Sequence, residues 1–117
     1  MSQFLVAIYR PHDYDPGAED AAMSRAIDDL NADMTAAGAR VFVGGLSAPA
    51  SARTVIAHAD GGMVVTPGLH VSASEHIGGL WVLEAADLEA AQEWARKAAL
   101  ACRAPVEVRA LLASAAT

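Results

Sequence analysis

Residues 54–83 decide the fold, and they read TVIAHADGGMVVTPGLHVSASEHIGGLWVL. Two short runs of β-forming residues, at 54–58 and 63–66, meet at an Asp-Gly-Gly turn, which predicts a β-hairpin. A Pro-Gly loop with two histidines follows, and a Gly-Gly pair opens a further apolar strand at 77–84. The segment therefore predicts a hairpin, a polar loop and a return of the chain to a sheet.

Upstream of the hairpin, the sequence predicts a strand, a helix and a second strand. The apolar run at 3–9 is rich in β-forming residues and ends at Arg10-Pro11. A second strand at 41–43 ends at another Gly-Gly pair. Between these two strands, apolar residues recur every three or four positions, which predicts a helix that ends at Gly38. These residues are Met23, Ile27, Leu30, Met34 and Ala37.

Downstream, the sequence predicts a helix and a last strand. Asp87 is placed to cap a helix that runs from residue 88 to about residue 100. Glu93 and Lys97 have the spacing of a supporting ion pair on this helix. The last strand covers residues 106–111.

The resulting order is strand, helix, strand, hairpin, strand, helix, strand. If both helices cover one face of a mostly antiparallel sheet, the apolar side of each helix is buried. We therefore expect an α+β ferredoxin-like sandwich with an inserted β-hairpin. The domain covers 1–112, and a frayed tail follows at 113–117. The second face of such a sheet needs either a second subunit or the inserted hairpin against it. We expect a homodimer, because closed two-fold pairing is the commonest oligomer.

Composition narrows the class of protein. A chain of 117 residues with 54% hydrophobic and 19% charged residues is typical of one globular domain. A net charge of -6 repels phosphate, so we expect neither a nucleic-acid nor a membrane partner. The lone Cys102 cannot form an internal disulfide, and the residues after Met1 lack the pattern of a signal peptide. These features predict a cytoplasmic protein.

The chain resembles the YCII-related proteins, and specifically their DGPF branch. That branch has a first strand ending in Tyr, a hairpin closed by VTDGPF, a Gly-Gly pair and a helix with the pattern D-x-x-x-A-x-x-W-A. Here Tyr9 ends the first strand, and residues 106–109 resemble the closing strand. The other matching positions are Gly68, Glu75, Gly78, Gly79, Asp87, Ala91, Trp94 and Ala95. The resemblance spans nearly the whole chain.

The chain also departs from the branch at its signature. Pro67 stands where the branch has Asp, and His70 stands where it has Phe, so a carboxylate is lost and a titratable ring is gained. The first-helix histidine of the broader group matches Ile27 here. The resemblance implies a dimeric α+β barrel with a pocket between sheet and loop, and a lyase or dehydrochlorinase-like role in some members.

Three loop residues are candidate catalytic groups: His70, Glu75 and His76. Imidazole and carboxylate groups can perform general acid-base chemistry or bind a metal ion. The spacing lacks the H-x-x-x-H or H-x-H pattern of metal sites, so we expect no metal and no cofactor. The alternative is that the histidines are ordinary surface-loop residues.

Tyr9, Arg10 and His12 are candidate ligand-binding residues, because they gather where the first strand ends. The planar guanidinium of Arg10 could bind a carboxylate, although an internal salt bridge would use it equally well. We expect Trp81, Trp94 and Cys102 to serve packing, and the paired glycines to serve turns and bulges. None of these glycines has the spacing of a phosphate-binding loop.

Two classes of function remain open. One is a dimer that binds a small molecule in a pocket near the dimer interface, or a protein partner, without catalysis. The other is a cofactor-free enzyme, lyase/dehydrochlorinase-like or monooxygenase-like, that binds a small aromatic or carboxylated molecule and uses a loop histidine as acid or base. The monooxygenase is suggested by fold analogy alone. The discriminating observation is whether the candidate catalytic residues share one cavity with Tyr9 and Arg10.

Overall fold

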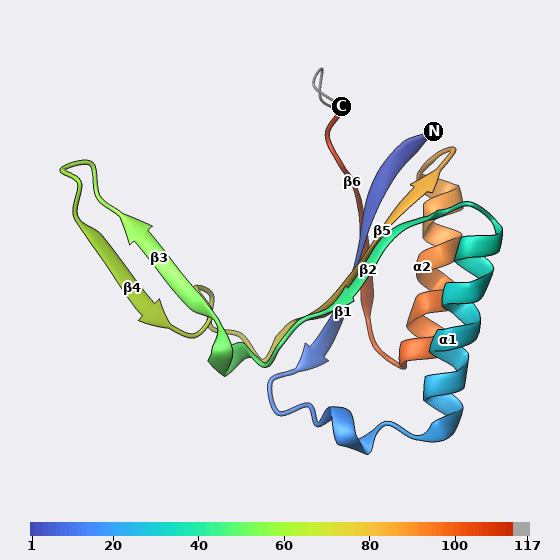
Figure 1. Ribbon diagram of the computed structural model, residues 1–117, viewed down its shortest axis with the longest axis horizontal. Helices are drawn as coiled ribbons and strands as arrows, with labels where there is room; N and C mark the ends of the chain where they lie inside the picture. The colour runs from blue at the N-terminus through green and yellow to red at the C-terminus, as the bar shows by residue number, and fades with distance from the viewer. Residues whose placement is uncertain (114–117) are drawn as a thin grey trace.

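The computed structural model describes residues 1–113, which form two antiparallel sheets and two α-helices (Figure 1). The predicted tail at 113–117 lies outside the described residues except for residue 113. The elements in chain order are β1 (Ser2–Pro11), the 3-10 turn η1 (Pro16–Ala18), α1 (Ala21–Ala36), β2 (Arg40–Gly45), the 3-10 turn η2 (Pro49–Ser51), β3 (Arg53–Ala57), β4 (Met63–Pro67), β5 (Glu75–Ala85), α2 (Leu88–Cys102) and β6 (Val106–Ala110).

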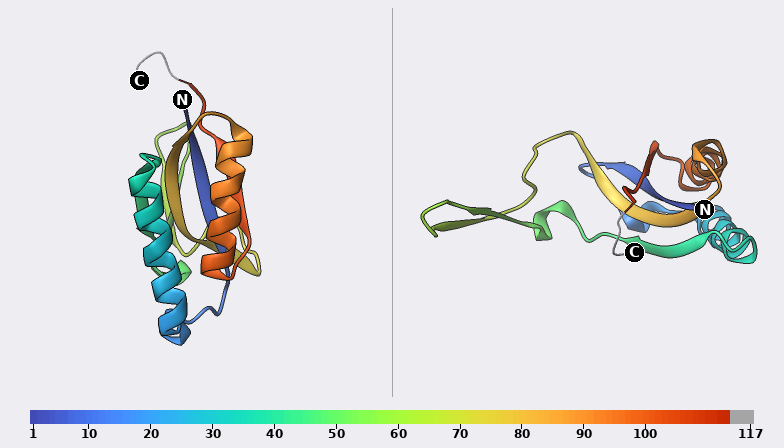
Figure 2. Two further views of the ribbon diagram at one scale, coloured as in Figure 1. Left: turned by 90° about the vertical axis from the view of Figure 1, so that its right-hand side faces the viewer. Right: turned by 90° about the horizontal axis from the view of Figure 1, so that it is seen from above.

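The main sheet has four antiparallel strands in the order β2-β5-β1-β6. Both helices lie against one face of this sheet, as the two views of Figure 2 show. This is the ferredoxin-like arrangement, so the predicted α+β class, the order of elements and the inserted hairpin are confirmed.

The core lies between this sheet and the helices. Phe4, Val6 and Ile8 of β1 alternate toward the helices, and Trp81 and Leu83 of β5 lie opposite them. The indole of Trp81 is 1% exposed and donates its N–H to Oδ1 of Asn31 on α1 at 2.8 Å, which satisfies its one donor. The helices supply small and flexible buried residues that fill the same layer: Leu30, Met34, Ala95, Ala98, Ala101 and Cys102. The packing roles predicted for Trp81 and Cys102 are therefore confirmed.

The helix ends follow the predicted capping signals. Asp87 caps α2, where its carboxylate accepts the N–H of Ala90 at 2.8 Å. Asp20 does the same for α1 through the N–H of Met23, also at 2.8 Å. Gly38, the predicted stop, lies just beyond α1 with a φ of 70°, a conformation that glycine adopts without strain.

The ion pair predicted on α2 is different in the structure. Glu93 binds Arg96, whose Nε and Nη2 both donate to the carboxylate, whereas Lys97 lies over the ring of Trp94 with its Nζ 4.7 Å from the ring centre. The planar guanidinium can engage a carboxylate with two donors, which a lysine cannot do. The aromatic face gives the lysine an alternative cation–π partner.

The inserted hairpin forms a sheet of its own, β3-β4, which stands away from the main body on the left of Figure 1. We call residues 53–67 the arm. Its turn is closed by His58, whose N–H donates to the carbonyl of Gly62 at 2.7 Å. Since the arm points away from the main sheet, the second face of that sheet is not covered by the hairpin of the same chain.

Across residues 1–113, no helix combines the length and the apolar composition needed to cross a bilayer.

Candidate functional site

A β-bulge in β5 shapes the end of the main sheet. Ile8 lies opposite Gly79, and the next pair is Tyr9 with Ile77, so Gly78 has no partner in the register. The chain therefore contains one extra residue at this point, and the side chains of β5 that precede it, at 75–77, change face relative to β1. The prediction that the paired glycines serve turns and bulges is confirmed here.

The bulge brings Arg10 and His76 to the same face. The two residues are register partners, and partners in an antiparallel pair point to the same side of the sheet. Without the extra residue, His76 would have taken the opposite face from Arg10. The side chain of Arg10 then crosses Gly78 so closely that an added Cβ there would lie 2.6 Å from the arginine Cγ.

Arg10 is held firmly, and its side chain is only 10% exposed. Its Nη1 donates to the carbonyl oxygen of Cys102 at 2.7 Å, and its Nη2 lies 3.9 Å from the carboxylate of Glu19. Its guanidinium carbon lies 4.3 Å from the ring centre of Tyr14. The charge is therefore buried with a carbonyl, a carboxylate and an aromatic face as partners, as a buried cation requires.

The two side chains that contact the Arg10 guanidinium, Tyr14 and Glu19, also contact each other. The hydroxyl of Tyr14 donates a hydrogen bond to the carboxylate of Glu19. Burial and this bond raise the pKa of Tyr14 to about 12. Burial also raises the pKa of the Cys102 thiol, so this cysteine is not an activated nucleophile.

Two imidazoles border the same region. Nδ1 of His76 is buried and has no hydrogen-bond partner among the described residues. The ring of His12 stands edge-on to it, with 5.9 Å between the ring centres and an angle of 88° between the planes. The backbone N–H of His12 donates to the carbonyl of Ser74 at 2.8 Å, which ties the loop after β1 to the strand that carries His76.

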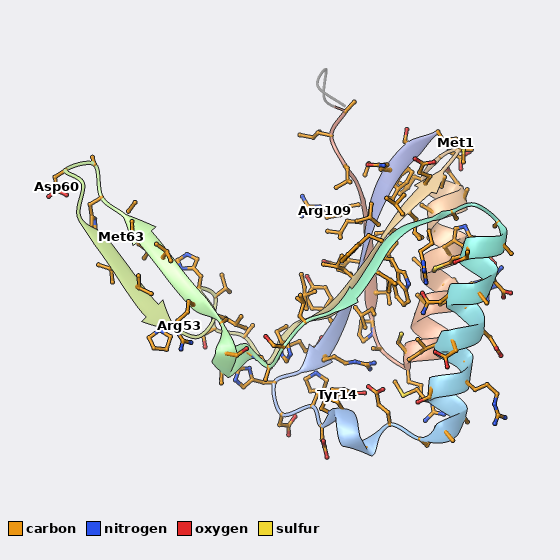
Figure 3. The ribbon with its side chains drawn as sticks, in the orientation of Figure 1. Met1, Tyr14, Arg53, Asp60, Met63 and Arg109 are labelled. Carbon is orange, nitrogen blue, oxygen red and sulfur yellow. The ribbon has the colours of Figure 1, made fainter. Side chains whose placement is uncertain are left out.

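These groups line a cavity of about 330 Å³ at the end of the main sheet, which we call the Arg10 pocket. Its walls come from the end of β1, the loop that leads to α1, the bulge in β5 and the segment between β2 and the arm. Figure 3 labels Tyr14 on the loop below the end of the sheet. The lining residues are Ile8, Arg10, His12, Tyr14, Pro16, Glu19, Gly45, Leu46, Ser47, Ala48, Pro49, His76 and Gly78.

The structure brings three of the six candidate residues together: Arg10, His12 and His76. Tyr9 and Glu75 line a separate hollow beside Glu107. The hydroxyl of Tyr9 donates to this glutamate at 2.6 Å, a bond that raises the pKa of Tyr9.

The remaining candidate, His70, lies at the base of the arm in a third hollow, with Arg53 and Leu69. The six residues therefore do not share one cavity, and they divide among three.

Tyr14 and Glu19 were not singled out by the sequence reasoning. They lie in the segment HDYDPGAE, whose Asp, Pro and Gly residues predict only a turn. That composition gives no indication that Tyr14 and Glu19 complete a pocket. The only available signal was an aromatic residue in an otherwise polar loop beside a strand end.

The described part of the chain, 1–113, holds no group of three His, Cys, Asp or Glu side chains close enough to bind a metal ion.

The sheet order, the two helices on one face and the hollow at the strand ends define a ferredoxin-like α+β domain with a pocket lined by both charged and apolar residues. A model of the YCII-related domain matches residues 1–113, and the chain belongs to this family. The resemblance drawn from the sequence is thereby confirmed at the level of the family. A search of curated proteins found no match to the chain.

Proposed function

We propose that this chain is a homodimeric YCII-related protein of the DGPF type that binds a small molecule in the Arg10 pocket, close to the dimer interface. The observation that carries the proposal is His76, whose buried Nδ1 has no partner among residues 1–113 and borders the cavity. A buried polar atom without a partner is costly, and a bound ligand would satisfy it.

The pocket favours a small aromatic or carboxylated molecule. Its volume of about 330 Å³ lies at the lower end of the range of small-molecule sites. Arg10 has five N–H donors, and its bond to Cys102 and its ion pair with Glu19 do not use all of them, so its guanidinium can also bind a carboxylate. The apolar surface of Ile8 and the ring of Tyr14 suit the remainder of such a ligand.

The uncovered face of the main sheet supports the homodimer. Leu5, Phe42 and Val82 are register neighbours on this face, and Phe42 is 57% exposed. A second copy of the chain covering this face would exclude water from it, and the resemblance to the YCII-related proteins implies such a dimer.

Benzoate is a suitable probe, with benzyl alcohol as its uncharged counterpart. We expect benzoate to shift the imidazole NMR signals of His12 and His76, and benzyl alcohol to bind at least about tenfold more weakly, because charge-assisted hydrogen bonds are the stronger ones. His76→Gln and Arg10→Met should each weaken benzoate binding. His58→Gln, on the arm, is the matched control and should bind like the parent. Equal binding by all four proteins would refute the proposal.

A cofactor-free acid-base enzyme is the second candidate function. It is favoured by the same Nδ1 of His76, which has no hydrogen-bond partner among residues 1–113, and by the nearby ring of His12. Phenylpyruvate, which has an acidic C–H next to its carbonyl, is a suitable probe in D₂O. We expect deuterium uptake that falls by about 100-fold in His76→Gln. His70→Gln and Glu75→Gln test the two candidates outside the pocket, and a loss confined to them would contradict the role of His76.

A further inference from the structure

The arm has apolar side chains on both of its faces. The register pairs Val55 with Val65 and Ile56 with Val64, and successive residues of a strand point to opposite sides. Val55 and Val65 are 56% and 57% exposed on one face, while Ile56 and Val64 are 44% and 47% exposed on the other. A two-stranded ribbon is marginal in water by itself, and one with two apolar faces needs a covering partner.

The edges of the arm lack the usual protection against association. Between Arg53 and Pro67 the only residue with a full charge is Asp60, which is at the tip. Natural proteins commonly place lysines or other charges along exposed strand edges to prevent pairing with another chain. The absence of such charges along β3 and β4 indicates that another protein surface covers this ribbon.

The size of the exposed surface fits a partner of substantial area. The chain exposes 7750 Å², whereas a compact monomer of 12.1 kDa exposes about 6,000 Å². Its radius of gyration is 16.5 Å, against about 13 Å for a compact domain of this length. The excess area exceeds the roughly 800 Å² that each partner buries in a standard interface.

A second copy of the chain fits both uncovered surfaces at once. Each protomer presents one apolar arm and one open sheet face around Phe42. A two-fold axis between two copies would allow each arm to reach the other protomer's face. An unrelated partner on the arm would leave the open sheet face exposed. Self-association is therefore the more economical solution.

We propose that the arm of each protomer crosses to the second copy and lies over its open sheet face near Phe42, with the Val55 and Val65 side inward. This inference rests on the homodimer of the proposed function and adds how the dimer is held. The Val55 and Val65 side also carries Met63, which is 65% exposed, so it is the more exposed apolar face of the arm.

Sedimentation equilibrium of the full chain tests the proposal. We expect the parent protein to have twice the 12.1 kDa mass of one chain. The double variant Val55→Asp with Val65→Asp should raise the dimer dissociation constant by roughly 100-fold or more, because it would bury unpaired charge. Leu100→Asp, at a residue 68% exposed on α2, is the control and should remain dimeric. Circular dichroism serves to check that each variant is folded.

The possible outcomes separate the two proposals. A monomeric parent protein would overturn both the homodimer and the arm exchange, and would leave the arm for a different partner. A dimeric double variant would overturn the arm exchange alone.

Cross-linking gives a second test that does not depend on a destabilised variant. Phe42→Cys and Val65→Cys chains are mixed, so that the two new thiols are on different molecules, while native Cys102 is 2% exposed and protected. We expect a short bis-maleimide to join residue 42 of one chain to residue 65 of the other, as identified by peptide mass spectrometry. Leu100→Cys in place of Phe42→Cys should give no such product. Failure of the 42–65 link in a dimeric sample would refute the arm exchange.

Discussion

The side chain of Arg10 crosses directly over Gly78, with the arginine Cγ 2.6 Å from the point where a Cβ on this glycine would lie. Gly78 is also the extra residue of the bulge in β5. One glycine therefore serves two purposes: it shifts the register that carries His76 to the side of Arg10, and it leaves room for the arginine stem.

Gly78→Ala should destabilise the protein and distort the Arg10 pocket. The added methyl group would meet the stem of Arg10, near the backbone, so the arginine and its bond to Cys102 must shift together. We expect a loss of about 1–3 kcal/mol in the free energy of unfolding, measured by urea denaturation. Gly45→Ala is the matched control, because a Cβ at Gly45 would meet nothing within 4 Å. Equal stability of the two variants would show that the Arg10 stem is not fixed by Gly78.

Both tyrosines of the chain should ionise above pH 10. Tyr14 has a pKa of about 12, raised by burial and by its bond to Glu19, and Tyr9 is raised by its bond to Glu107. Ultraviolet absorbance of phenolate, followed from pH 9 to 13, should show neither tyrosine titrating at its unfolded value of about 10. The same titration in denaturant is the control, and there both should ionise near about 10.

The sign of the linked stability follows from this shift. Since the folded pKa of Tyr14 lies above its unfolded value, the protonated hydroxyl stabilises the fold fully below about pH 10, and this contribution is lost as the pH rises through about 12. Tyr14→Phe should therefore show a shallower fall of stability over that interval. An unchanged slope would contradict the role of the Tyr14–Glu19 bond.

Asn31→Ala should lower the stability of the protein, because it leaves the buried indole N–H of Trp81 without an acceptor. Trp81 is 1% exposed, and its N–H has Oδ1 of Asn31 as acceptor at 2.8 Å. We expect a loss of about 1–3 kcal/mol in the free energy of unfolding. A double-mutant cycle with Trp81→Phe should give a coupling energy of about 0.5 kcal/mol or more. Asp28→Ala, exposed on the same helix, is the control, and additivity of the two core substitutions would refute the coupling.

The main body could be predicted because its signals are local. Helical periodicity around Leu30 and Met34, the cap at Asp87 and the stop at Gly38 each depend on residues within a few positions along the chain. The family resemblance agreed with these signals, and a family model matches residues 1–113. Strand ends differed by one or two residues, which is where local signals are weakest.

The candidate site could be predicted only in part. Arg10 and His12 follow the first strand, so their proximity is local, but His76 joins them through the register between β1 and β5. A single extra residue at Gly78 reverses which face His76 takes, and no pattern of hydrophobicity specifies where that extra residue falls. His70 was grouped with His76 by sequence distance, yet the loop after the arm separates them into different hollows.

The sequence by itself determined the elements and their order, because hydrophobic period, turn residues and caps act over short distances. Only the tertiary structure decided that the arm stands free of its own sheet and that Arg10, Tyr14, Glu19 and His76 meet in one pocket. Those outcomes depend on strand register and on the direction of a hairpin. Both arise from packing between segments far apart in the chain, which no local stretch of residues encodes.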